Sequence, residues 1–348
     1  MISMRATAFY QHGGPEQLKY GEDFPVPSIN FDEVLIKVHS CSLNHLDLFV
    51  RQGLPGLQLK LPHILGSDVS GTVEQIGENI SNVSVGDRVV VNPGLWDGTC
   101  EFCLKGEHSL CESFQILGEH VPGGYAGFIK IPSRNCLILP QDFPFNKAAA
   151  GALVYLTAWR MLTTQTQLKE GEDILIIGAG GGVATAAIQI AKYLGANVIA
   201  TTSSELKMKE ASKIGADKVF NYKTDPDWAK NIYKFTDKKG VDVVLDSVGT
   251  STWESSLRSL KSGGRLVTCG ATTGFIGNTN IRLVFWRQLK IMGSTMATNP
   301  EFNEVMKLIF QGKLDPVISK EFSLQEASKA HEYLENMEQF GKVLLKVN

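Results

Sequence analysis

The sequence predicts an α/β protein of two domains, one rich in β-structure and one built on a doubly wound parallel sheet. Its 348 residues exceed what a single hydrophobic core normally organises. Between residues 30 and 135, short apolar runs are separated by glycine and polar turns, a pattern typical of irregular β-structure. From residue 172 onward, continuous apolar runs alternate with helical segments, as parallel strands covered on both faces require.

In the β-rich domain the expected strands are EVLIKV at 33–38, GTVEQIG at 71–77 and DRVVV at 87–91. The alanine- and leucine-rich segment 146–162 predicts a helix that leads out of this domain and acts as a hinge. We expect a second helix near 301–311, a strand in VISKEF, a capping box formed by Ser323 and Glu326, and a final strand in KVLLKV. This tail is expected to pack back on the first domain, so the predicted domains are 1–152 with 295–348, and 153–294.

The parallel-sheet domain is expected to contain strands in DILIIG, NVIATT, DKVFNY, VDVVLDSVG and GGRLVTCG. A helix that ends at Gly195 follows the first of these strands, and a polar helix that ends at Gly215 follows the second. Strand, helix and strand in turn are the pattern of a nucleotide-binding sheet.

Charge and composition favour a small-molecule partner. A formal net charge of −2 creates no field that would gather nucleic acid or an anionic lipid surface. The first residues, MISMRATAFYQHGG, lack the features of a secretory signal, and no apolar run is long enough to span a bilayer. We therefore expect a cytoplasmic protein with neither nucleic-acid nor membrane partners.

A glycine-rich loop stands between the first parallel strand and the helix after it, in ILIIGAGGGVA at 174–184. At this position bare backbone can approach a pyrophosphate, and the helix N-terminus supplies N–H groups and a favourable dipole. The alternative is that the glycines only permit close helix-to-sheet packing. The predicted dinucleotide loop comprises Gly178, Ala179, Gly180, Gly181, Gly182 and Val183.

The residues after the second parallel strand favour NADP over NAD. Thr202 stands where an NAD-preferring site places a carboxylate for the ribose 2′-hydroxyl. Ser203 and Ser204 can donate hydrogen bonds to a 2′-phosphate, and Lys207 can neutralise it. The same serines can also cap the next helix. The predicted cofactor-binding set is completed by Tyr222, Gly270 and Lys342.

Three of the six cysteines fall within twelve positions, in WDGTCEFCLKGEHSLC. Cys100, Cys103 and Cys111 can converge on one tetrahedral ion, with Asp97 as the fourth ligand. Four protein ligands leave no open position, so this zinc would be structural. The alternative is three reduced thiols without an ion.

These features together resemble the medium-chain dehydrogenase/reductase superfamily, in particular its quinone oxidoreductase and zinc-type alcohol dehydrogenase branches. Further matching segments are LNHLDLFVRQG at 43–53, LPHILGSDVSGTVEQIG at 61–77, ILGEHVPGGYAGF at 116–128 and FGKVLLKV near the end. The resemblance implies a GroES-like catalytic domain joined to a Rossmann domain, with the active site in the cleft between them. It also implies that segment 97–111 is the family's structural zinc lobe, and that the protein forms a homodimer or homotetramer.

The departures from the zinc-type branch predict a site without a catalytic metal. Asn44, Ser67 and Leu153 stand at the positions of the three catalytic zinc ligands, and none of these side chains makes the bonds that Zn²⁺ prefers. Leu46 replaces the hydroxyl that begins the family's proton relay. The N-x-x-D pattern of Asn44 and Asp47 resembles the pattern found in the zinc-free quinone and enone reductases.

The sequence therefore predicts NADP(H)-dependent reduction of quinones or α,β-unsaturated carbonyl compounds, whose conjugation spreads the developing negative charge. Asn44, Ser67 and Thr157 are candidate polar groups for the substrate oxygen. Glu119 and His120 are candidate proton donors, and Asp47 is expected to orient neighbouring backbone. Two alternatives stay open: an alcohol dehydrogenase with an altered metal site, and a non-catalytic NADPH-binding redox sensor.

Overall fold

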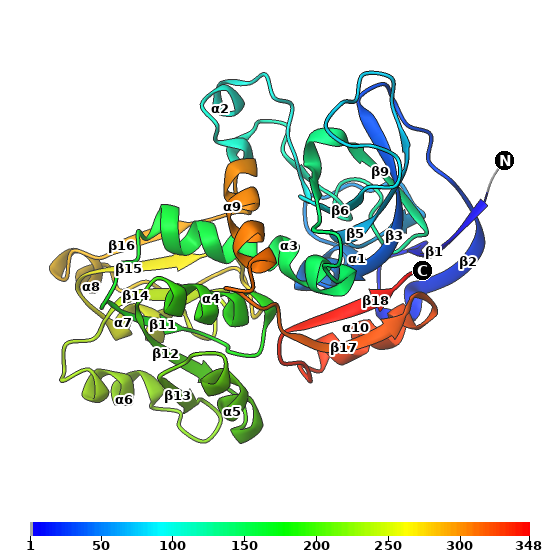
Figure 1. Ribbon diagram of the computed structural model, residues 1–348. Helices are drawn as coiled ribbons and strands as arrows, with labels where there is room; N and C mark the ends of the chain where they lie inside the picture. Colours follow the sequence, from blue (N-terminus) through cyan, green and yellow to red (C-terminus); the bar gives the residue numbers. More distant parts are fainter. Residues whose placement is uncertain (1–2) are drawn as a thin grey trace. The chain divides into compact units, whose positions relative to one another are not determined.

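The computed structural model describes residues 3–348, and the chain divides into two units (Figure 1). Unit 1 contains the residues up to Leu153 together with Ala297–Gly312 and Pro316–Asn348. Unit 2 contains Val154–Met296 and Lys313–Asp315. The predicted boundaries at 152/153 and 294/295 differ by one and two residues from the observed ones, and the sequence did not predict that 313–315 belongs to unit 2.

Unit 1 is built mainly on a seven-stranded sheet in the order β10-β6-β5-β3-β18-β17, with β9 also paired to β3. A three-stranded sheet in the order β2-β1-β4 and the small β7-β8 pair complete its β-structure. The strands are β1 Ser3–Phe9, β2 Leu18–Pro25, β3 Glu33–Ser42, β4 His63–Ile64, β5 Asp68–Ile76, β6 Arg88–Val91, β7 Gly94–Leu95, β8 Gln115–Ile116, β9 Phe128–Pro132, β10 Cys136–Ile138, β17 Ile318–Ser323 and β18 Lys342–Lys346.

The C-terminal strand β18 pairs with β3, the longest strand of this sheet. β18 runs antiparallel to β3 and parallel to β17, and it places Leu344 opposite Ser42. The helices of the unit are α1 His45–Gln52, α2 Glu101–Leu104, α9 Asn299–Phe310 and α10 Ala327–Glu335, and α3 Phe145–Arg160 continues from unit 1 into unit 2. The predicted capping box is present: the Glu326 carboxylate accepts from the backbone N–H of Ser323 at 3.3 Å, and the Ser323 side chain accepts from the backbone N–H of Glu326.

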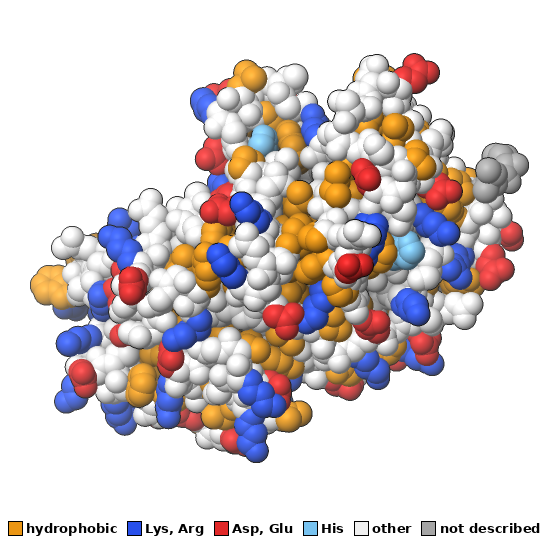
Figure 2. All heavy atoms as spheres, in the orientation of Figure 1, with side chains coloured by type: hydrophobic (Ala, Val, Ile, Leu, Met, Phe, Trp, Pro, Cys, Tyr) orange, Lys and Arg blue, Asp and Glu red, His pale blue; other side chains and the backbone are white. Residues whose placement is uncertain are grey.

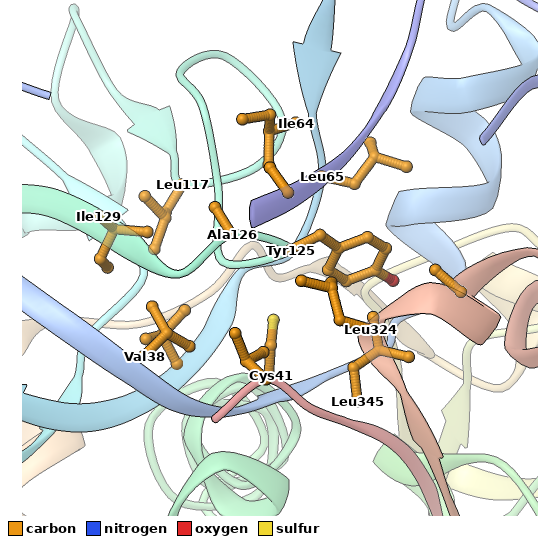
Figure 3. Packing of buried hydrophobic residues seen from close by; sticks show 14 of the residues in the cluster. Val38, Cys41, Ile64, Leu65, Leu117, Tyr125, Ala126, Ile129, Leu324 and Leu345 are labelled. Atoms are coloured by element: carbon orange, nitrogen blue, oxygen red, sulfur yellow. The ribbon is translucent and has the colours of Figure 1, made fainter. Parts of the chain in front are cut away.

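The core of unit 1 joins residues from both ends of the chain. The buried ring of Tyr125 lies among apolar side chains that include Leu65 and Leu117, and Leu324 and Leu345 reach the same core from the C-terminal segment (Figure 3). The tail therefore packs on the β-rich unit as the sequence predicts.

Unit 2 is a parallel sheet in the order β13-β12-β11-β14-β15-β16, the doubly wound arrangement of dinucleotide-binding domains. All six side chains of β14 are buried, which explains the apolar residues at 241 and 243–245; the two aspartates of the strand are buried as well. The elements are β11 Asp173–Ile176, α4 Gly182–Tyr193, β12 Asn197–Thr202, α5 Glu205–Lys213, β13 Lys218–Asn221, α6 Trp228–Phe235, β14 Val241–Asp246, α7 Trp253–Ser259, β15 Leu260–Thr268, α8 Ile281–Trp286 and β16 Lys290–Gly293. The predicted fold class is confirmed.

Charged side chains of both signs are interspersed over the face drawn in Figure 2, in agreement with the small net charge. Within residues 3–348, no helix has the length and apolar character needed to cross a membrane.

Candidate active site

Asp47 connects the start of helix α1 to the segment that leads into strand β5. Its carboxylate accepts hydrogen bonds from the backbone N–H of Asn44 at 2.7 Å and of Gly66 at 2.9 Å. Burial raises the pKa of Asp47 to about 7, and the two backbone N–H groups oppose this rise. Both acceptor oxygens serve the local backbone, so Asp47 holds the loop on which Ser67 stands.

Asn44, Asp68 and Lys342 form a buried polar cluster, here called the Asn44 cluster. Asp68 accepts hydrogen bonds from the Asn44 amide at 3.0 Å, from the Lys342 ammonium at 2.9 Å and from the backbone N–H of Leu153 at 2.7 Å. The Lys342 ammonium also donates to Asn44 Oδ1 at 2.5 Å and to the carbonyl oxygen of Leu43 at 2.6 Å. The side chain of Asp68 is completely buried, and that of Lys342 is 3% exposed. An amide, a carboxylate and an ammonium thus share one buried site.

Ser67 and Thr157 each carry a buried hydroxyl for which residues 3–348 provide no hydrogen-bond partner. Ser67 follows Gly66 directly and belongs to unit 1, whereas Thr157 belongs to unit 2. Leaving a buried hydroxyl unpaired costs about 1–3 kcal/mol, so an unpaired group in a native protein is a candidate ligand contact.

Glu119 lies beside the Ser67 loop and next to His120. The backbone of Gly118 packs directly on that of Gly66. A Glu119 carboxylate oxygen lies 3.7 Å from His120 Nδ1, and burial raises the pKa of Glu119. Because His120 Nδ1 accepts a hydrogen bond from the backbone N–H of Ile116, the neutral ring carries its proton on Nε2. The raised pKa makes the Glu119 carboxylate a better proton carrier than an exposed glutamate.

His45 follows Asn44 at the first position of α1. Burial and the nearby Lys342 charge lower its pKa to about 4, so the ring is neutral at physiological pH.

The glycine loop of unit 2 fits a dinucleotide pyrophosphate. Gly178 has a φ of +77°, a conformation that favours glycine, and helix α4 begins at Gly182 with no side chain capping its N-terminus. The backbone N–H of Ala179 donates to the Thr201 carbonyl oxygen at 2.7 Å and anchors the turn. Because no side chain caps α4, the amide N–H groups of its first turn can donate to an anion as their partner.

The predicted adenosine-side residues have different local roles. The Thr202 hydroxyl donates to the Ala179 carbonyl oxygen at 2.5 Å, so it stabilises the glycine loop and its proton does not serve a 2′-phosphate. Ser204 caps α5 by accepting from the Lys207 backbone N–H. The pKa of Lys207 is lowered by burial and by the Lys223 charge, which marks a place where an anion would be stabilising.

Ser203 follows β12 directly, Tyr222 comes directly after β13, and Gly270 comes two residues after β15, so all three lie near the carboxyl ends of parallel strands. This is the edge at which sheets of this kind bind nucleotides. Lys342 belongs to the other unit, and all three of its N–H donors are used there.

The lobe from Trp96 to Phe114 brings together the predicted metal ligands. One ligand atom from each of Asp97, Cys100, Cys103 and Cys111 lies within 4.8 Å of the others. Tetrahedral zinc with Zn–S bonds near 2.3 Å requires ligand separations of about 3.8 Å, so small side-chain adjustments suffice. The Ser113 hydroxyl donates to Asp97 at 3.0 Å and orients the carboxylate. This donor set fits a closed, structural zinc site.

Two family models match the chain: the alcohol dehydrogenase GroES-like domain at residues 30–141 and the zinc-binding dehydrogenase domain at 182–311. An acryloyl-coenzyme A reductase of Sulfurisphaera tokodaii is 36% identical, over 96% of this chain and 98% of the relative. The chain belongs to the medium-chain dehydrogenase/reductase superfamily. A quinone oxidoreductase of Homo sapiens is 31% identical over 94% of this chain and 93% of its own length.

Among solved structures, an NAD-dependent alcohol dehydrogenase is 43% identical with a TM-score of 0.95, covering 99% of this chain and 100% of that one. This medium-chain dehydrogenase/reductase is an oxidoreductase, and the named relatives include both dehydrogenases and reductases.

Two features of the site of this medium-chain dehydrogenase/reductase come from the structure alone. Asp68, which has no role in the sequence-based prediction, is the acceptor of the Asn44 cluster, and Lys342, predicted as a cofactor ligand, donates to residues of unit 1. The available signal was a lysine that directly precedes the apolar residues 343–345 of the C-terminal strand, because a charge buried there needs a partner.

Proposed function

We propose that this protein is an NADPH-dependent reductase of quinones or α,β-unsaturated carbonyl compounds that works without a catalytic metal. The observation that carries the proposal is the Asn44 cluster. Its donors are an amide and an ammonium, and its one carboxylate already accepts three hydrogen bonds, so it offers no set of ligands for Zn²⁺. Acceptors that delocalise the developing charge themselves suit such a site.

Asn44 is the proposed donor to the substrate oxygen. Its Oδ1 accepts from the Lys342 ammonium, and one of its two amide N–H groups donates to Asp68. The second N–H remains for an oxyanion, and the unpaired Ser67 hydroxyl is a further donor. Asp47 keeps the backbone of this region in place, and the pair of Glu119 and His120 is the proposed source of the proton that completes the reduction.

A bound nicotinamide dinucleotide would supply the hydride. The glycine loop at 178–183 is proposed to hold its pyrophosphate, and Ser203, Ser204 and Lys207 are proposed to hold a 2′-phosphate. No carboxylate occupies the last residue of β12, and the charges of Lys207 and Lys223 favour the extra anion of NADPH over NADH.

Steady-state turnover on a substrate panel tests the proposed function. NADPH oxidation is measured with a quinone, a simple enone and acryloyl-coenzyme A, and alkanol oxidation is measured with NADP⁺. We expect reduction of at least one conjugated acceptor that a chelator does not inhibit, and a loss of about 100-fold in kcat/KM for Asn44→Ala. Chelator-sensitive alkanol oxidation would instead support an alcohol dehydrogenase with an altered metal site. Tight NADPH binding with no turnover would support the redox sensor.

We also propose that the protein forms homodimers or homotetramers through unit 2. The segment from Phe275 to Trp286 exposes several large apolar side chains, of which Ile276 is 81% and Trp286 75% exposed. Strand β16 forms the adjacent end of the parallel sheet, where its outer edge has no partner strand among the described residues. An apolar surface beside a free strand edge favours pairing with a second copy.

Sedimentation of two matched variants tests this assembly. Phe285 and Phe31 are both 63% exposed, and only Phe285 lies in the apolar segment. We expect Phe285→Asp to lower the sedimenting mass and Phe31→Asp to leave it unchanged. A wild-type monomer at micromolar concentration would contradict the proposal.

A further inference from the structure

The amino group of Lys342 is fully occupied inside unit 1. An ammonium has three N–H donors. Those of Lys342 go to the Leu43 carbonyl oxygen, to Asn44 Oδ1 and to the Asp68 carboxylate, at 2.6, 2.5 and 2.9 Å. With the side chain 3% exposed, no donor is left for a cofactor phosphate.

The same contacts determine which way the Asn44 amide points. Its oxygen faces the ammonium and its nitrogen faces the Asp68 carboxylate. Rotation of the amide by 180° would bring N–H groups against an ammonium and an oxygen against a carboxylate. Both contacts are repulsive in a buried site, so the Lys342–Asp68 pair selects one orientation.

The ammonium also strengthens Asn44 as a donor. A positive charge on the amide oxygen draws electron density from the nitrogen, which makes the remaining N–H more acidic and its hydrogen bonds stronger. The effect needs no movement during the reaction, because strands β18 and β5 hold the two charges in place.

We propose that Lys342 is a positioning residue that, together with Asp68, orients and polarises the Asn44 amide for the substrate oxygen, and that it is not a ligand of the cofactor. This inference rests on the proposed function, in which Asn44 binds the carbonyl oxygen of the acceptor.

The test compares Lys342→Met with Lys346→Met, a control on the exposed part of the same strand. We expect Lys342→Met to lower kcat for the conjugated acceptor by at least about 10-fold while the Kd for NADPH, followed by fluorescence, changes by less than about 3-fold. Lys346→Met should change neither quantity. A Kd for NADPH that rises about 10-fold or more with kcat retained would identify Lys342 as a phosphate ligand and overturn the proposal.

A double-mutant cycle separates positioning from general structural damage. In an Asn44→Ala background, Lys342→Met should lower kcat by less than about 2-fold, because the amide on which Lys342 acts is already gone. Equal losses in both backgrounds would refute the proposal. If Lys342→Met does not fold because Asp68 is left without its charged partner, the double variant Lys342→Met with Asp68→Asn removes both charges and takes its place in the cycle.

A spectroscopic measurement keeps this proposal distinct from the proposed function. With ¹⁵N-labelled asparagine, the Asn44 side-chain amide signal is assigned by its loss in Asn44→Ala. We expect one pair of proton signals in the wild type, and a shifted or doubled pair in Lys342→Met. An unchanged pair would refute the orientation, whatever the substrate panel shows. If the panel shows no turnover but this signal shifts, only the proposed function fails.

Discussion

Gly118→Ala should be strongly destabilising, because two separate penalties meet at that position. Gly118 has a φ of +81°, and a Cβ built on it would lie 2.6 Å from backbone atoms of Gly66. The left-handed conformation costs alanine about 1 kcal/mol. Crowding the new methyl group against the backbone of Gly66 adds about 1–3 kcal/mol, because the atoms that it meets belong to the backbone and not to a flexible side chain that could move away. We therefore expect a total loss of about 3 kcal/mol.

Gly86→Ala is the matched control. Gly86 has a φ of +92°, but a Cβ there would meet no atom within 4 Å. Only the conformational penalty applies, so the expected loss of stability is about 1 kcal/mol. The difference of about 2 kcal/mol between the variants isolates the steric contact between residues 118 and 66.

The stability of both variants is measured by urea unfolding at one fixed concentration of zinc and NADPH. The free energies of unfolding are compared from the two urea midpoints with a common m-value. Gly118→Ala should also reduce turnover more than Gly86→Ala does, because Gly66 binds Asp47 and precedes Ser67. Equal unfolding midpoints for the two variants would show that the loop at 116–124 yields to the methyl group, and would refute the packing argument.

Three further predictions concern pH, metal and cofactor. Burial raises the pKa of Asp47 from 3.8 to about 7, so the stability that its protonated form provides is present below pH 4 and lost as the pH rises through 7. Relative to the neutral variant Asp47→Asn, the free energy of unfolding of the wild type should fall by about 4 kcal/mol between pH 4 and 8. A difference between the two proteins that stays constant with pH would contradict the shift. Metal analysis should find about one zinc per chain, with Asp97→Ala weakening zinc binding at least about 10-fold and Asp97→Cys retaining it; a second, chelatable zinc would contradict the metal-free site. Ser203→Asp should raise the Kd for NADPH at least about 10-fold and leave that for NADH nearly unchanged, whereas Ser212→Asp on the exposed face of α5 should alter neither; equal effects of the two substitutions would argue against a 2′-phosphate at Ser203.

The principal strands of both units could be predicted from the sequence because their patterns are local. The buried run at 241–246 and the glycines after Ile177 follow from neighbouring residues alone, and the structure places a parallel strand and a strand-to-helix loop there. The cysteine spacing likewise predicted which four side chains converge. Short helices such as Ile281–Trp286 were not predicted, because six residues carry too little periodicity and depend on the sheet for their stability.

By itself, the sequence determined the fold class, the family resemblance and the absence of zinc-binding side chains at Asn44, Ser67 and Leu153. Only the tertiary structure decided what occupies that region. Lys342 lies 274 positions from Asp68 along the chain, and pairing of β18 with β3 brings them to 2.9 Å. No local pattern reports such a contact. Its physical cause is that a buried ammonium must use every donor, and the folded sheet alone determines which acceptors are within reach.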